Sequence, residues 1–124
     1  MVTGANSGVG KATCMGLAHT GATVIMVCRN KEKGESARQD IINKSGNTKV
    51  DLLISDFNRF ESIHEMVKVF KSKYNRLDAL CNIAGIISPK RQVTQDGIEK
   101  TLAVNYLSHF FSVCLKADLS VKSD

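Results

Sequence analysis

The order of apolar and polar positions divides the chain into alternating extended and helical segments. Short apolar runs, typical of buried strands, lie at 22–28, 50–55 and 77–83, and the first of them is rich in β-branched residues. One helical stripe, at i, i+3, i+4 and i+7, consists of Ile63, Met66, Val67 and Phe70. Further helical patterns cover 9–20, 31–45 and 96–115, the last single or broken.

Strands that alternate with helices of this length predict parallel β-α-β units with right-handed crossovers. The expected architecture is an α/β, doubly wound parallel sheet of about four strands, forming one partial domain over residues 1–124. Only Met1, Val2 and Thr3 precede the first turn, whereas a typical strand has about five residues. We therefore expect a sheet truncated at both ends, with an open edge that favours self-association.

The segment from Thr3 to Gly10 is a glycine-rich turn that opens a helical pattern. Glycine permits positive φ and lets backbone N–H groups approach a ligand without a Cβ in the way. The free N–H groups and the positive dipole end of the helix would face the same ligand. This turn therefore predicts a phosphate-binding site. Its candidate contacts are Gly4, Asn6, Ser7, Gly8, Val9 and Gly10.

Two kinds of phosphate-binding loop fit such a turn, and the sequence favours one. A nucleotide triphosphatase loop that ends in Gly10-Lys11 would need glycine where Ala5 stands and a hydroxyl where Ala12 stands. A dinucleotide-binding, Rossmann-type loop instead needs a strand after the helix, with a side chain that contacts the ribose at its end. The run at 22–28 supplies that strand, and it ends at Arg29.

Arg29, followed by Asn30, indicates which dinucleotide is bound. An acidic residue here would bind both ribose hydroxyls and repel a 2′-phosphate, whereas a guanidinium binds that phosphate. We therefore predict NADP(H) over NAD(H). The alternative is that Arg29 is a solvated residue that opens a charged helix.

The chain resembles the short-chain dehydrogenase/reductase family in four motifs, which follow one another in the family's order. The family's T-G-x-x-x-G-x-G turn is matched in full, and its acidic residue after the third strand is matched by Asp56, followed by Phe57. Its N-N-A-G segment is present with one replacement, as Asn82-Ile83-Ala84-Gly85, and its helix asparagine matches Asn105. The sequence around these motifs is most similar to the retinol dehydrogenase and protochlorophyllide reductase branch.

The resemblance implies a role for each matched residue, beside a plainer alternative. Asp56 would contact the adenine, or cap a helix that starts near Arg59. Asn82 could bridge neighbouring strands through its amide, while Ala84 and Gly85 leave room for the cofactor or simply form a turn. In the family, Asn105 supports a water that relays protons beside the catalytic lysine.

The family's reaction is reversible hydride transfer between the nicotinamide and a carbonyl or alcohol, and it needs a serine and a Tyr-x-x-x-Lys motif. Tyr74 is followed four residues later by Asp78, and Tyr106 by Phe110, so neither forms this motif. We therefore expect the 124-residue chain alone to be inactive and to meet a substrate only if a C-terminal part exists. The alternative is a non-catalytic fragment that acts as an interaction module or has no folded function.

The composition adds little to this interpretation. The net charge of +5 favours an anionic cofactor, and the lysines near 68–76 form a solvated helix face without interleaved aromatic residues, so we expect no nucleic-acid binding. The four cysteines, at 14, 28, 81 and 114, and the three histidines have no metal-ligand spacing, so we expect reduced thiols and no metal site. Without an apolar run that could cross a bilayer, a cytoplasmic location is expected, although some relatives carry a membrane anchor before this point.

Overall fold

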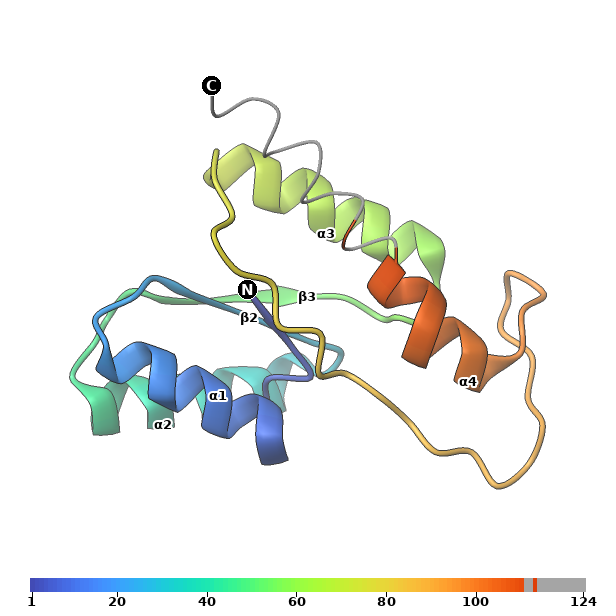
Figure 1. Ribbon diagram of the computed structural model, residues 1–124, viewed down its shortest axis with the longest axis horizontal. Coiled ribbons are helices and arrows are strands. Elements are labelled where there is room, and N and C mark those ends of the chain that lie inside the picture. The colour runs from blue at the N-terminus through green and yellow to red at the C-terminus, as the bar shows by residue number, and fades with distance from the viewer. Residues whose placement is uncertain (111–112, 114–124) are drawn as a thin grey trace. The chain divides into compact units, whose positions relative to one another are not determined.

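The computed structural model of the chain describes residues 1–110 and 113. These residues form two compact units (Figure 1). The first consists of Met1–Ile54 with Cys81–Ala84, and the second of Ser55–Leu80 with the described residues from Gly85 onward.

A parallel sheet forms the centre of the first unit. Its strands are β1 (Val2–Thr3), β2 (Val24–Cys28) and β3 (Val50–Ile54), in the order β1-β2-β3. Val2 lies opposite Met26, and Met26 lies opposite Leu52. The parallel sheet and its flanking helices confirm the predicted Rossmann-type fold.

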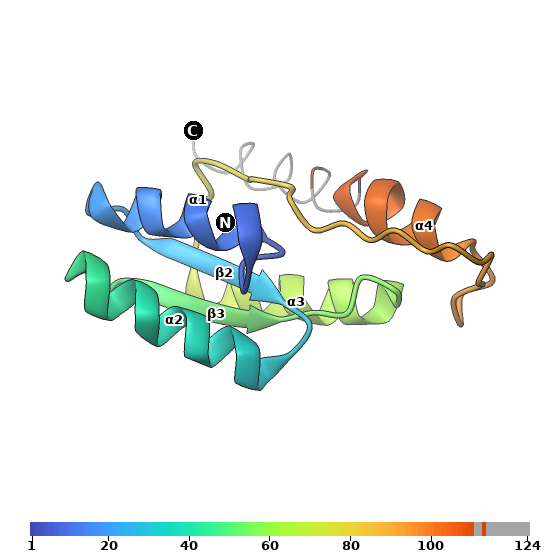
Figure 2. The ribbon, with the colours of Figure 1, turned by 90° about the horizontal axis from the view of Figure 1, so that it is seen from below.

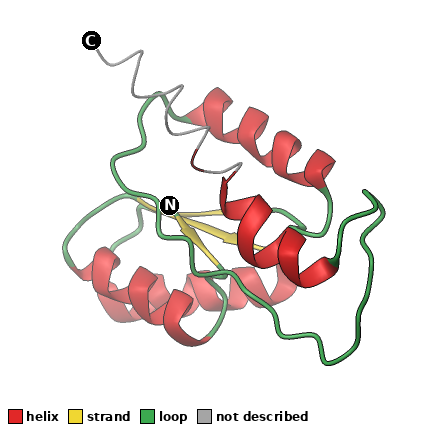
Figure 3. Cartoon of the chain, turned by 45° about the vertical axis from the view of Figure 1, so that its right-hand side comes forward, coloured by secondary structure: helices red, strands yellow, loops and turns green. Residues whose placement is uncertain are grey.

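The predicted strand at 77–83 is wrong in extent, because it is reduced to one bridge between Cys81 and Val2. The Cys81 N–H donates to the Met1 carbonyl at 2.9 Å, and the Thr3 N–H donates to the Cys81 carbonyl at 3.0 Å. Among the described residues, this segment has only the two-residue strand β1 to pair with, so its strand hydrogen bonds end there. Figure 3 shows the rest of the segment between α3 and α4 as loop.

The helices α1 (Gly8–His19) and α2 (Lys31–Ser45) lie side by side on one face of the sheet (Figure 2). Small residues allow α2 to approach the strands closely, because a Cβ at Gly34 would stand 2.5 Å from the Cys28 sulfur. The apolar side chains between helices and sheet form the core, which includes Val2, Cys14, Val24, Met26, Ala37 and Ile41.

Asn47, which follows α2, ties the end of α1 to the segment before β2. Its amide nitrogen donates to the carbonyl of Ala18 at 3.0 Å and to that of Ala22 at 2.8 Å. One side chain thus binds two carbonyl groups, one at the end of α1, which also accepts the Gly21 N–H, and one in the segment before β2.

The second unit contains α3 (Phe60–Lys73), α4 (Lys100–Leu102) and the π-helix η1 (Ala103–Leu107), after which the chain stays helical through Phe110. The predicted apolar stripe of α3 is buried. The helix predicted over 96–115 begins only at Lys100, because 93–99 form a hairpin and the Glu99 carboxylate caps the N–H groups of Thr101 and Leu102. Its predicted end lies outside the described residues. In the described part of the chain, no helix combines the length and apolarity needed to cross a membrane.

The role of Asn47 gives a stability prediction. Asn47→Ala removes both hydrogen bonds to the carbonyls of Ala18 and Ala22, and should lower the free energy of unfolding by about 1–3 kcal/mol. Urea unfolding followed by circular dichroism measures the change. The control is Asn43→Ala, an exposed position on α2, and an equal effect of both variants would contradict the assigned role.

Candidate functional site

The glycine-rich turn joins β1 to α1 and is closely packed on one side. Gly4 has φ of 64°, and a Cβ there would stand 2.9 Å from the Ala84 Cα. A Cβ on Gly10 would overlap the Gly4 carbonyl oxygen. Gly8, with φ of 53°, has no atom within 4 Å of where its Cβ would be, so the turn is open on that side. The fold therefore needs glycine at positions 4 and 10 for packing, and at position 8 for its backbone conformation.

The start of α1 keeps its N–H groups available. Ser7 is the N-cap, but its side chain makes no capping hydrogen bond. The first N–H groups of a helix have no partner within the helix. They are thus left to an external acceptor on the open side of the turn.

Thr3 fixes this turn to the segment after Cys81, a role that the sequence analysis did not assign. Its hydroxyl oxygen accepts the N–H of Ile83 at 3.0 Å and the N–H of Ala84 at 3.1 Å. The threonine that opens the T-G-x-x-x-G-x-G motif could have indicated this role, because a buried hydroxyl beside a glycine turn needs hydrogen-bond partners.

The expected bridge by Asn82 is not found. Its side-chain oxygen is buried and has no hydrogen-bond partner among the described residues. Thr3 makes the contacts that hold this segment, which leaves the Asn82 amide oxygen as an unused acceptor.

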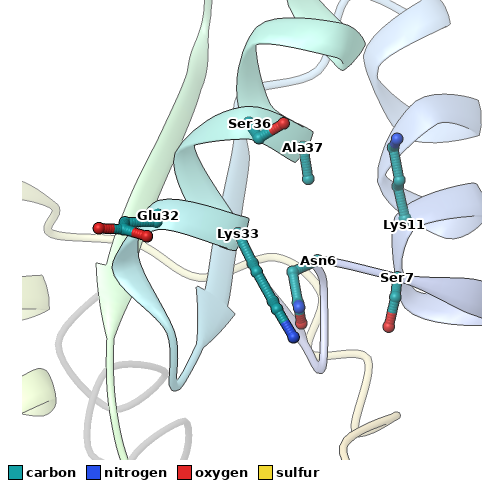
Figure 4. A pocket seen from close by; sticks show the side chains of 7 residues that line it. All are labelled: Asn6, Ser7, Lys11, Glu32, Lys33, Ser36 and Ala37. Atoms are coloured by element: carbon teal, nitrogen blue, oxygen red, sulfur yellow. The ribbon is translucent and has the colours of Figure 1, made fainter.

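A pocket of about 450 Å³ opens beside the turn, within the size range of small-molecule sites (Figure 4). Of the predicted residues it contains Asn6 and Ser7. The others come from α1 and from the first turns of α2, and are Lys11, Glu32, Lys33, Ser36 and Ala37. None of these five was among the predicted site residues, although Lys33 lies only four positions after Arg29.

Two ammonium groups border this pocket, and they are held differently. Lys11 Nζ lies 2.7 Å from Asp40 Oδ2, and Asp40 Oδ1 also lies 2.9 Å from Lys44 Nζ. The hydrogen bond from Lys11, followed by that from Lys44, holds the pKa of the Asp40 carboxyl below its usual value. The Lys33 ammonium forms no ion pair within the described ranges, and Figure 4 shows its side chain extending toward Asn6.

Arg29 and Asn30 follow β2 directly. Arg29 is exposed and its guanidinium makes no hydrogen bond or ion pair with the described part of the chain. Asn30 caps α2, because its side-chain oxygen accepts the Lys33 N–H at 2.9 Å. Arg29 is therefore available to a ligand, whereas the side-chain oxygen of Asn30 is engaged in the fold.

The described cysteines are free thiols inside the first unit. Burial raises the pKa of Cys14 to about 11 and also raises that of Cys28, so both stay uncharged at neutral pH. Cys114 lies outside the described residues.

In the second unit, Asp56 stabilises the turn before α3 and does not cap the helix, so the capping alternative is wrong. Its carboxylate accepts the Asn58 N–H at 3.0 Å, while the N-cap of α3 is Arg59. The Phe60 N–H at the start of the helix donates to Asp96 at 3.0 Å. The buried Phe57 ring meets the His109 ring edge to face, with centroids 6.4 Å apart.

Asn105 lies in the π-helix and holds the loop that follows Gly85. Its side-chain oxygen accepts the Ile86 N–H at 2.7 Å, and its amide nitrogen donates to the Ile86 carbonyl at 2.8 Å. Asn105 is exposed, yet both of its polar ends are bonded. A π-helical turn often marks a functional position.

The arrangement of a β-strand, glycine turn and helix, with a second strand ending in a basic residue, is that of a nucleotide-binding unit. The family model described as short chain dehydrogenase matches residues 1–119. The chain belongs to this family.

Its relatives include dehydrogenase/reductase SDR family member 12 of Bos taurus, which is 45% identical over 107 residues, covering 86% of this chain and 33% of that protein. Human retinol dehydrogenase 11 is 39% identical over 110 residues, covering 89% and 35%. Among solved structures, a short-chain dehydrogenase from Sphingobium yanoikuyae in complex with NADPH is 26% identical with a TM-score of 0.77, covering 98% and 48%. The chain thus spans about a third of these two curated relatives and about half of that structure.

The Thr3 hydroxyl gives a prediction for the turn. Thr3→Val leaves two N–H groups, those of Ile83 and Ala84, without an acceptor and should lower the free energy of unfolding by about 1–3 kcal/mol. Thr3→Ser keeps the hydroxyl and should lose less. Chemical denaturation of the three proteins measures this, and a Thr3→Ser loss as large as that of Thr3→Val would contradict the hydroxyl's role.

Proposed function

We propose that this chain is the NADP(H)-binding portion of a short-chain dehydrogenase/reductase. The observation that carries the proposal is the glycine turn beside the pocket that Lys33 borders. Other backbone atoms pack closely against this turn at Gly4 and Gly10, whereas the space at Gly8 is open. A phosphate is the ligand that such a turn and the first N–H groups of α1 accept.

The residues present fit a dinucleotide. The space at Gly8 is free of protein atoms, and the Asn82 side-chain oxygen is a buried acceptor that lacks a partner in the described part of the chain. Gly4, Asn6, Ser7, Gly8, Val9 and Gly10 would hold the phosphates, while Asn82, Ala84 and Gly85 would adjoin the cofactor. Asp56 and Phe57 would receive the adenine.

NADP(H) is proposed over NAD(H) because basic side chains are available where a 2′-phosphate would bind. Arg29 is exposed and without a partner among the described residues, and Lys33 follows four positions later in the first turn of α2. The relative from Sphingobium yanoikuyae, whose structure holds NADPH, agrees with this choice.

For the whole protein we propose the reversible transfer of hydride between a nicotinamide and a carbonyl or alcohol, chemistry that the bound cofactor supplies. In this chain Asn105 would act as a positioning residue, because it fixes the backbone at Ile86. The 124 residues alone would bind the cofactor without turnover. Oxidation of NADPH by the purified chain, dependent on a ketone or aldehyde, would contradict this last point. Self-association, the absence of nucleic-acid binding and a cytoplasmic location stay predictions.

The open side of the turn can be tested by filling it. Gly8→Ala should weaken NADP⁺ binding at least about tenfold, because its Cβ would enter the space that we assign to the ligand. Gly21→Ala is a matched control, since Gly21 also has positive φ, 81°, and no atom within 4 Å of its Cβ position, but lies between the end of α1 and β2, outside the glycine-rich turn. Calorimetric titration measures both. Equal losses in the two variants would indicate backbone strain alone.

The choice of dinucleotide depends on Arg29. Arg29→Leu should reduce the preference for NADP⁺ over NAD⁺ by about ten- to a hundredfold, the usual strength of charge-assisted hydrogen bonds. The affinities for both dinucleotides, measured by calorimetry, give the ratio. Lys49→Leu, which removes the same charge at an exposed position before β3, is the control. An unchanged ratio in Arg29→Leu would refute the assignment of Arg29.

A further inference from the structure

The Lys11 side chain lines the proposed cofactor pocket, but its ammonium is held by a carboxylate and does not extend toward Asn6 as Lys33 does. Figure 4 shows the side chains of Lys11 and Ser7 pointing in opposite directions, while Lys33 extends toward Asn6. The group that holds Lys11 is the carboxylate of Asp40 on α2, at 2.7 Å.

Asp40 is well placed to compete with a ligand for this lysine. Its side chain is 30% exposed and that of Lys11 is 33% exposed, so neither is locked in the core. Lys44 also contacts Asp40, and thus the carboxylate stays ionised and attractive to Lys11 over the physiological pH range. A lysine side chain is long and flexible, and its ammonium can reorient around a fixed helix position.

Lys11 also starts from a position close to the expected anion. It follows Gly10 directly on α1 and lines the same pocket as Lys33, where we place the 2′-phosphate. Of the pocket's two lysines, only Lys33 is outside an ion pair within the described residues. The pocket, which Glu32 also lines, therefore has one lysine outside an ion pair in the described part of the chain, Lys33, and one, Lys11, held by Asp40.

We propose that Asp40 is a specificity-determining residue that withholds the Lys11 ammonium from the bound dinucleotide and so limits the preference for the phosphorylated form. This inference rests on the proposed function. Asp40 contacts Lys11 rather than the ligand, so it acts by positioning. Removing its charge releases Lys11 toward the pocket, and the doubly charged 2′-phosphate benefits more than the rest of the dinucleotide.

The experiment compares NADP⁺ and NAD⁺ binding to Asp40→Asn and to the unaltered chain by calorimetry at low salt. Asp40→Asn should tighten NADP⁺ binding by about fivefold, in line with a partly exposed charge interaction, and change NAD⁺ binding by less than about twofold. Adding Lys11→Met to Asp40→Asn should abolish this gain. Asp40→Ser, which also removes the charge, should reproduce it and guards against a local packing effect of one replacement.

Glu35→Gln is the matched control, because it removes one negative charge from the same helix at a residue that contacts Arg38 and Gln39 instead. Tightening by Glu35→Gln equal to that by Asp40→Asn would overturn the inference in favour of a general charge effect. It would also be overturned if the gain survives Lys11→Met or if neither Asp40 variant tightens NADP⁺ binding. If the unaltered chain binds neither dinucleotide, the proposed function itself fails, and this inference with it.

Discussion

The close contact between the glycine turn and the segment at Ala84 is the constraint on which the rest of the site depends. Gly4 lies so near the Ala84 backbone, and Gly10 so near the Gly4 carbonyl, that a side chain at either position would displace the chain. The Thr3 hydroxyl fixes this contact through two backbone N–H groups. Because the turn is held from behind, its open side at Gly8 and the start of α1 keep one orientation.

The fold of the first unit was largely predictable, because local patterns specify it. The boundaries of α2 were predicted at 31–45 and observed at Lys31–Ser45, since Asn30 caps its start and Gly46 adopts the left-handed conformation after its end. The strands β2 and β3 follow their β-branched runs. The glycine turn was also predictable, because short spacing within one segment encodes it.

The parts that sequence reasoning missed depend on residues far apart in the chain. The pairing of Lys11 with Asp40, and the contact of Asn105 with Ile86, become visible only when the helices and loops are placed. The segment 77–83 has a strand pattern, but a strand needs a partner, and the two-residue β1 supplies almost none. The sequence indicated that Asn82 bridges neighbouring segments, a role that Thr3 performs in the structure. Both side chains are polar, so only their positions in the fold distinguish them.

The most direct test of the central claim, that this turn is built to receive a dinucleotide phosphate, is the response of backbone amides to NADP⁺. The amide N–H chemical shifts of the isotope-labelled chain can be followed by NMR during a titration. The account predicts that the largest changes occur in the turn from Asn6 to Lys11 and around Arg29 and Lys33. Saturable changes confined to other parts of the chain, or none at millimolar NADP⁺, would contradict it.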